Sequence, residues 1–199
     1  MANPSAAIAH VVKLVITLFC MQFVDNSFSI QILEKGWAIR AFQILLIHSV
    51  LGIIRYGGVN STKKIRTYYE LLTSIIEVFP VACFTTEVLL QYEVPKVLCF
   101  LCFILSLSPT IIELSSPRMK DRTAFNKYID AIFGLQAALM ILICVLNQNY
   151  SGLSLAVSYI FARYVSEDFC DLRDVPYVDM SQYSLSFIEL FAIATIKDF

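Results

Sequence analysis

The residues of this chain that could do chemistry are ionisable and amide side chains placed inside long apolar stretches. Glu77 and Glu189 each lie near the middle of such a stretch. His48 and Gln136 lie at a similar depth, and Glu87 lies nearer one end. Because a charged side chain at the centre of a bilayer costs about 2.5–3.5 kcal/mol on insertion scales, we predict that these groups face one another, a cavity or the interior of a bundle.

Two interpretations of this polar set remain open. The side chains can hold helices together by hydrogen bonds, or they can form an intramembrane site for a ligand, proton or ion. Glu77, Glu189 and His48 come from three separate stretches at one depth, so we expect them to form a shared polar centre. Pro80 predicts a kink between Glu77 and Glu87.

Other reactive patterns point away from catalysis. Cys99 and Cys102 form a Cys-x-x-Cys pair, but an intramembrane thiol oxidoreductase also needs a second pair in a loop, and the loops expected on that side contain no cysteine. The only histidines are His10 and His48, and no loop has zinc-ligand spacing. Phosphate-binding Gly-Lys-Ser/Thr and the Gly-x-Ser-x-Gly elbow are also missing. The sequence therefore predicts a non-enzymatic protein without a catalytic, cofactor or metal site.

The composition indicates what must position these residues. Of 199 residues, 58% are apolar and 16% are charged, whereas soluble domains average about 45–50% and about 25%. The mean hydropathy is +0.70. This balance excludes an ordinary soluble domain and makes the lipid bilayer the expected partner. The net charge of −1 excludes a general attraction to nucleic acid.

Seven apolar stretches have the character of helices that cross about 30 Å of hydrocarbon. They are Ala6–Val24, Ala38–Arg55, Leu71–Gln91, Pro95–Ile112, Tyr128–Leu146, Tyr150–Tyr164 and Ser181–Ile196. The sixth is short and diluted by serine and glycine, so six or seven spans are expected. The connections are short, with tight links at Tyr92–Val94 and Asn147–Asn149, so residues 1–199 are expected to form one all-α, polytopic membrane helix bundle.

The distribution of basic residues predicts the orientation. With the N-terminus in the cytosol, that side holds eleven Lys and Arg residues, Lys13 among them, and the far side holds four. This bias follows the positive-inside rule. The spans average about 18 residues, or about 27 Å of helix, which favours the thin bilayer of the endoplasmic reticulum or early secretory pathway.

The start Ser5–Ala9 and the segment Arg163–Asp168 before an acidic loop and a final helix resemble the animal transmembrane protein 276 type of multi-pass membrane protein. The resemblance implies a membrane bundle and transfers no site residue. We therefore expect a multi-pass endomembrane protein that binds other membrane proteins or lipid. The alternative is a small carrier or channel for a proton, ion or lipid-like solute that uses the midplane carboxylates.

Overall fold

The computed structural model describes residues 3–24, 36–58, 62–115 and 122–197. These residues form helices and no strand, which confirms the predicted all-α fold. The helices are α1 (Pro4–Val24), α2 (Trp37–Gly57), α3 (Lys63–Ile76), α4 (Phe79–Gln91), α5 (Lys96–Ser115), α6 (Arg122–Leu146), α7 (Tyr150–Tyr164), α8 (Glu167–Asp171) and α9 (Tyr177–Lys197).

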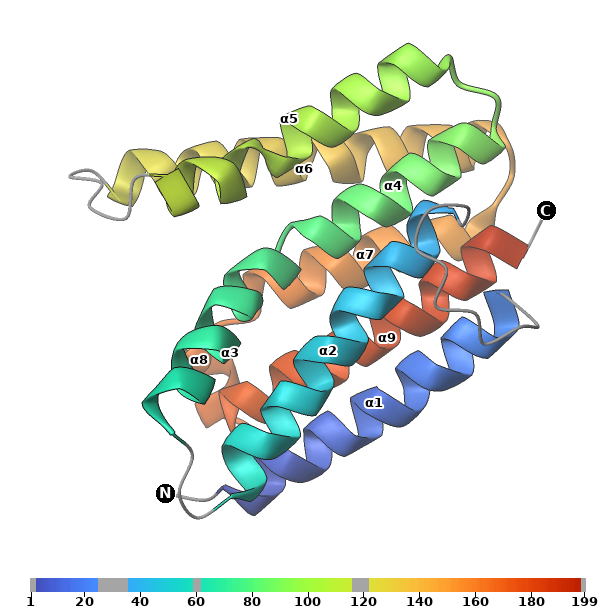
Figure 1. The fold of residues 1–199 in the computed structure, drawn as a ribbon. Helices are drawn as coiled ribbons and strands as arrows, with labels where there is room; N and C mark the ends of the chain where they lie inside the picture. Colours follow the sequence, from blue (N-terminus) through green and yellow to red (C-terminus); the bar gives the residue numbers. More distant parts are fainter. Residues whose placement is uncertain (1–2, 25–35, 59–61, 116–121, 198–199) are drawn as a thin grey trace.

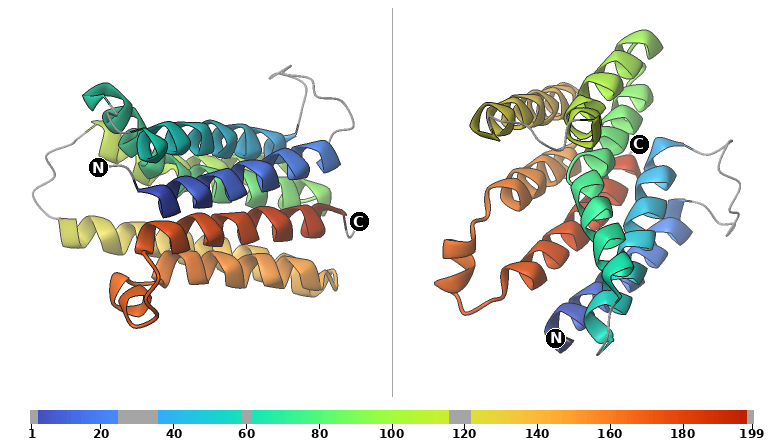
Figure 2. Two further views of the ribbon diagram at one scale, coloured as in Figure 1. Left: turned by 90° about the horizontal axis from the view of Figure 1, so that it is seen from below. Right: turned by 60° about the vertical axis from the view of Figure 1, so that its left-hand side comes forward.

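The long helices run roughly side by side, and successive passes of the chain along the bundle alternate in direction when α3 and α4, which follow each other in the same direction, are taken as one pass (Figure 1). The two termini consequently lie at opposite ends of the bundle. Helix α1 packs between α2 and α9, as the left view of Figure 2 shows, and α9 packs in turn on α7. Helix α4 contacts α2, α5, α6 and α9, so it occupies a central position.

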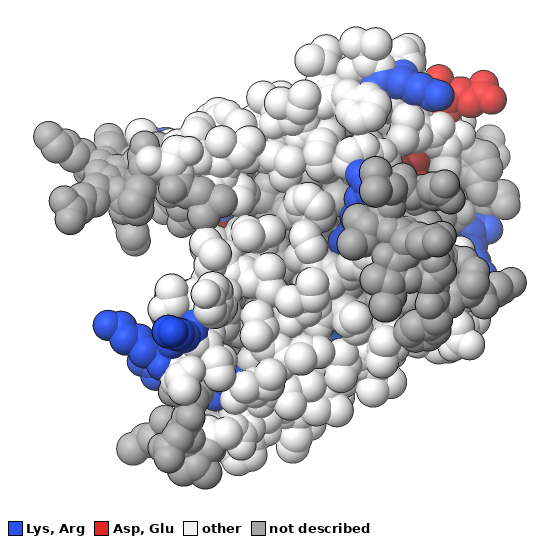
Figure 3. Space-filling view, viewed as in Figure 1, with Lys and Arg blue, Asp and Glu red and all other residues white. Residues whose placement is uncertain are grey.

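Two helices, α1 and α9, turn a polar face toward the interior of the bundle. Helix α1 buries His10, Lys13 and Thr17, whereas Ile8 and Val15 are each 60% exposed. Helix α9 repeats this pattern, and its buried polar residues are Asp179, Gln182, Ser184, Ser186, Glu189 and Thr195. In Figure 3 the charged side chains of the described residues lie toward the two ends of the visible face, with a broad uncharged surface between them. An apolar outer surface, with the polar side chains of these helices turned inward, is the arrangement that suits lipid.

Four segments are long and apolar enough to cross a membrane: Pro4–Val24, Trp37–Gly57, Lys63–Gln91 and Thr123–Leu146. Lys96–Ile112 is a shorter apolar helix. The predicted membrane character agrees with these helices, whereas the predicted six or seven spans exceed the four that helix length and composition support. The difference arises because α7 has only 15 residues and α9 carries many polar groups on its buried face.

Helices α3 and α4 form one crossing that is interrupted at Glu77 and Val78. Pro80 lies in the first turn of α4, where its missing N–H costs nothing. A continuous helix would instead bring the proline ring against the carbonyl of Ile76, four residues earlier. The interruption therefore follows from Pro80, as the sequence indicates.

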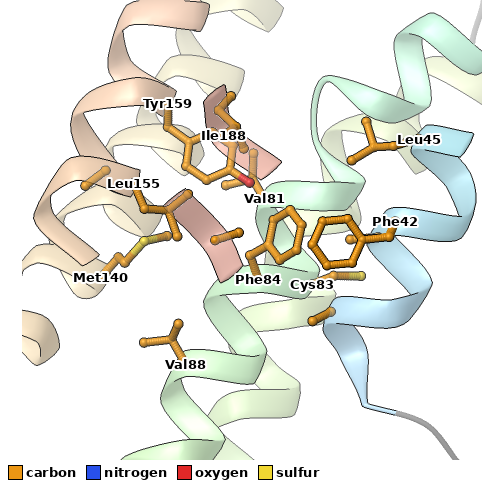
Figure 4. Packing of buried hydrophobic residues seen from close by; sticks show 14 of the residues in the cluster. Phe42, Leu45, Val81, Cys83, Phe84, Val88, Met140, Leu155, Tyr159 and Ile188 are labelled. Carbon is orange, nitrogen blue, oxygen red and sulfur yellow. The ribbon is translucent and has the colours of Figure 1, made fainter. Parts of the chain in front are cut away.

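An apolar core packs between these helices (Figure 4). The rings of Phe42 from α2 and Phe84 from α4 meet edge to face, with centroids 5.1 Å apart. On the other side of α4, Leu155 and Tyr159 of α7 pack near Ile188 of α9. This core holds α2, α4, α7 and α9 in fixed positions around the polar residues described next.

Candidate functional site

Lys13 lies at the centre of a polar cluster inside the bundle. Its side chain is fully buried, at 0% exposure. Its Nζ is 2.6 Å from Nδ1 of His48 on α2 and donates to Oε1 of Gln182 on α9, also at 2.6 Å. This corrects the sequence analysis, which counted Lys13 among the charges of the N-terminal end. Lys13 lies mid-helix, and it links α1 to both of its neighbours.

His48 extends the cluster to α3. An ammonium group can only donate, so we assign Nδ1 of His48 as the acceptor from Lys13 and Nε2 as the protonated nitrogen. Nε2 then donates to the Thr73 hydroxyl at 3.1 Å, and that hydroxyl donates to the carbonyl of Tyr69 at 2.8 Å. These bonds fix the imidazole of His48 in its neutral form.

His10 forms a direct contact between α1 and α3. Its Nε2 is 3.1 Å from the Tyr69 hydroxyl. The ring fits because Gly52 of α2 lies against it and a Cβ at that position would overlap the imidazole. The Tyr69 ring stacks on His48, with centroids 4.7 Å apart, and also lies under the guanidinium of Arg55. The cluster therefore reaches from the bundle interior to the basic end.

Glu189 on α9 is a buried acid that interacts with Lys13. It is 0% exposed, and both carboxyl oxygens lack a hydrogen-bond partner among the described residues. It lies two helical turns beyond Gln182 on the same face of α9. Lys13 and Glu189 interact electrostatically, whereas the nearby Thr17 hydroxyl donates to the backbone carbonyl of Lys13 at 2.8 Å. A buried carboxyl without donors is costly in its charged form.

A cavity of about 120 Å³ adjoins this cluster. Its lining includes Thr73, Gln182 and Tyr159. Thr73 is hydrogen-bonded to His48, and Gln182 is hydrogen-bonded to Lys13. Tyr159 is 4% exposed, and its hydroxyl has no hydrogen-bond partner among the described residues. The more exposed lining residues, Glu77 and Arg163, mark the outer end. The cavity thus runs from a charged rim to the buried polar cluster.

The rim carries an ion-pair network. Arg163 on α7 contacts Asp130 on α6 at 3.0 Å and Glu77 at 3.9 Å. Tyr177, at the start of α9, also lines the cavity. The rim is therefore polar, mixed in charge and accessible to water.

Metal and thiol chemistry find no geometric support among the described residues. No group of three His, Cys, Asp or Glu side chains there could hold a metal ion. All six cysteines are free, and the pair Cys99 and Cys102 lies on α5, away from the Lys13 cluster. Comparison with known proteins finds no matching protein family, curated protein or solved structure.

The predicted shared centre of three residues is divided in the structure. His48 lies in the cluster, and Glu189 is buried near Lys13. The Glu77 side chain is instead 56% exposed and pairs with Arg163 at the cavity rim. The interruption between α3 and α4 places Glu77 in the connection, so its carboxylate reaches the rim rather than the interior.

The other two predicted residues have separate environments. Glu87 accepts the backbone N–H of Ala38 at 3.1 Å and so caps the first turn of α2. Gln136 on α6 is buried beside a smaller cavity that Phe133 also lines, and its Nε2 has no partner among the described residues. Glu87 therefore joins α4 to α2, and neither residue belongs to the Lys13 cluster.

The prediction missed Lys13, His10, Gln182 and Tyr159. A signal for the α1 residues exists in the sequence, because His10, Lys13 and Thr17 are spaced to share one helical face. Tyr159 gave a weaker signal, as a tyrosine inside an apolar stretch rather than at its end.

Proposed function

We propose that the protein crosses an endomembrane seven times, with its N-terminus in the cytosol, in the endoplasmic reticulum or early secretory pathway. The crossings would be α1, α2, the interrupted pair α3–α4, α5, α6, α7 and α9. Support comes from their alternating directions and from termini at opposite ends of the bundle (Figure 1). With Lys13 moved to the interior, the loop and helix-end sequences still carry ten basic residues on the N-terminal side and four on the other.

Within this bundle we propose a small carrier or channel for a proton, an ion or a small solute. One observation carries the proposal: a cavity with a charged rim leads to a cluster of fully buried ionisable groups. Apolar side chains would hold the helices together at lower cost than a buried lysine and glutamate. Ionisable groups next to a membrane cavity are typical of transport pathways.

The second candidate is a non-enzymatic accessory protein that binds other membrane proteins or lipid. Helix α5 favours it, because its main contacts are only with α4 and α6 and its outward residues are large and apolar. The resemblance to the transmembrane protein 276 type fits either function. In this case the polar cluster would serve only to hold the bundle together.

Filling the cavity tests the carrier proposal. Purified full-length chain in liposomes is compared with Ala162→Phe, which places a ring in the cavity, and with Val157→Phe, on the lipid-facing side of the same helix. Entrapped dyes report proton, potassium and chloride flux under imposed gradients. We expect wild type and Val157→Phe to conduct at least one of these ions, and Ala162→Phe to do so about tenfold more slowly. Equal flux in both variants, or none above protein-free liposomes, would favour the accessory function.

A further inference from the structure

We propose that Glu189 and Lys13 form a proton-binding couple inside the bundle, and that Tyr159 joins this couple to the cavity. The proposal rests on the carrier function above and names the proton as the ion that the site binds. Its three residues come from α9, α1 and α7, and none belongs to the ion-pair network at the rim.

The first step is the charge on Lys13. Both of its hydrogen bonds are short, at 2.6 Å, and a charged donor shortens a hydrogen bond. Its two acceptors, His48 and Gln182, are neutral, so neither balances the ammonium. A buried ammonium needs a counter-charge, and Glu189 can supply it. This fully buried acid lies on the same face of α9 as Gln182, to which Lys13 donates, and it interacts electrostatically with Lys13.

The second step is the condition of Glu189. As a carboxylate it balances Lys13, but neither oxygen accepts a hydrogen bond from the described residues. As a carboxylic acid it loses the unsolvated charge, and the couple then carries the charge of Lys13 alone. The carboxylate form leaves a buried negative charge without hydrogen bonds, and the acid form leaves the charge of Lys13 unbalanced. Because each form avoids the cost of the other, the site can exchange a proton. The exchange is a single protonation: the carboxylate of Glu189 gains one proton from the aqueous side to become the acid, while Lys13 keeps all three of its own.

The neighbouring helices present several other titratable groups to Lys13 and Glu189, but among the residues that the structure describes no second acid lies beside Glu189. Helix α2 presents His48 to Lys13, and on α1 itself His10 lies before Lys13 and Cys20 after it. Helices α7 and α4 present Tyr159 and Cys83 to the same region. The other buried acid of α9, Asp179, lies ten residues before Glu189, which is about 15 Å along the helix.

The third step is access. Tyr159 lines the cavity, and Ile188, adjacent to Glu189 in the chain, lines it too. Figure 4 shows the Tyr159 side chain directed from α7 toward Val81 of α4, with its hydroxyl inside the bundle. That hydroxyl has no hydrogen-bond partner among the described residues, and it interacts electrostatically with Cys83 and Glu189. Because a phenol both donates and accepts, Tyr159 can pass a proton between the cavity and the carboxyl group.

The experiment combines infrared difference spectroscopy with proton flux, both on the full chain in liposomes. Changing the pH between about 5 and 9 should produce a carboxylic-acid band that is lost in Glu189→Gln. Proton flux should fall about tenfold or more in the same variant. Tyr159→Phe should slow the flux and leave the pH midpoint of the band unchanged, because it removes only the route. Glu87→Gln is the matched control: its amide oxygen can still cap α2, so band and flux should equal those of wild type.

The outcomes separate this couple from the carrier function. A titrating band that depends on Glu189, in a protein that moves no ion, would keep the couple and remove the carrier. Flux that is blocked by Ala162→Phe but unchanged in Glu189→Gln would keep the carrier and overturn the couple. A band that persists in Glu189→Gln would also overturn it.

Discussion

Lys13 is the residue whose replacement should destabilise the bundle most clearly. Lys13→Met keeps the length of the side chain but leaves Nδ1 of His48, Oε1 of Gln182 and the charge of Glu189 without their partner. Breaking a buried charge pair typically costs about 3–5 kcal/mol. We expect a lower unfolding temperature in detergent, with partial recovery in Lys13→Met/Glu189→Gln, since the uncompensated acid is then removed. Additive losses in the double variant would contradict a pair.

Single residues also show how far sequence reasoning reaches. Ionisable groups in apolar stretches pointed to His48 and Glu189, because their cost in lipid requires burial. Lys13 was missed because a charge count assigns each lysine to an end, although its spacing from His10 and Thr17 predicts an inward helical face. The position of Glu77 depends on where α3 stops, and tertiary packing decides that point.

At the scale of helices, the ends of α4, α7 and α9 are joined through Asn149. Its side chain accepts the N–H of Gly152 at 3.0 Å and caps α7. Its Nδ2 donates to the Tyr92 hydroxyl at 2.9 Å and to the carbonyl of Thr195 at 3.0 Å. The sequence predicted the tight links around Tyr92 and Asn149, and the helix ends confirm them. It could not predict this junction, because the contacts join residues more than 40 positions apart.

This junction predicts unequal effects for two neighbouring asparagines. Asn149→Ala removes a helix cap and two contacts between helices, so the free energy of unfolding should fall by about 1–3 kcal/mol. Asn147→Ala removes only a bond to Ile143 on the preceding turn and should change it by less than about 0.5 kcal/mol. Denaturant unfolding in detergent measures both. Equal effects would show that the contacts of Asn149 contribute no more than a local bond.

At the scale of the whole molecule, α1 and α9 turn polar faces into the bundle, whereas the faces that α2 and α4 bury are mainly apolar. Composition alone predicted a membrane protein, because 16% charged residues cannot cover a soluble surface of this size, and the long apolar stretches predicted its helices. Composition cannot say which face of each helix turns inward. That follows from the neighbours: α1 turns its polar face toward α2 and α9, which supply His48 and Gln182, and leaves Ile8 and Val15 outside. Helix α9 likewise packs its polar face on α1 and α7, which is why a helix with so many polar residues belongs to the bundle.

The seven-crossing arrangement predicts that the two ends of the chain lie on opposite sides of the membrane. An epitope beside Lys64 should be digested when protease is added to cells whose plasma membrane alone is permeabilised, because the basic residues favour the cytosol there. An epitope after Phe199 should be digested only when the endoplasmic reticulum membrane is also opened. Protection beside Lys64 would reverse the orientation. Cytosolic exposure of both epitopes would require an even number of spans, and α7 is the crossing to lose, because its 15 residues span only about 22 Å.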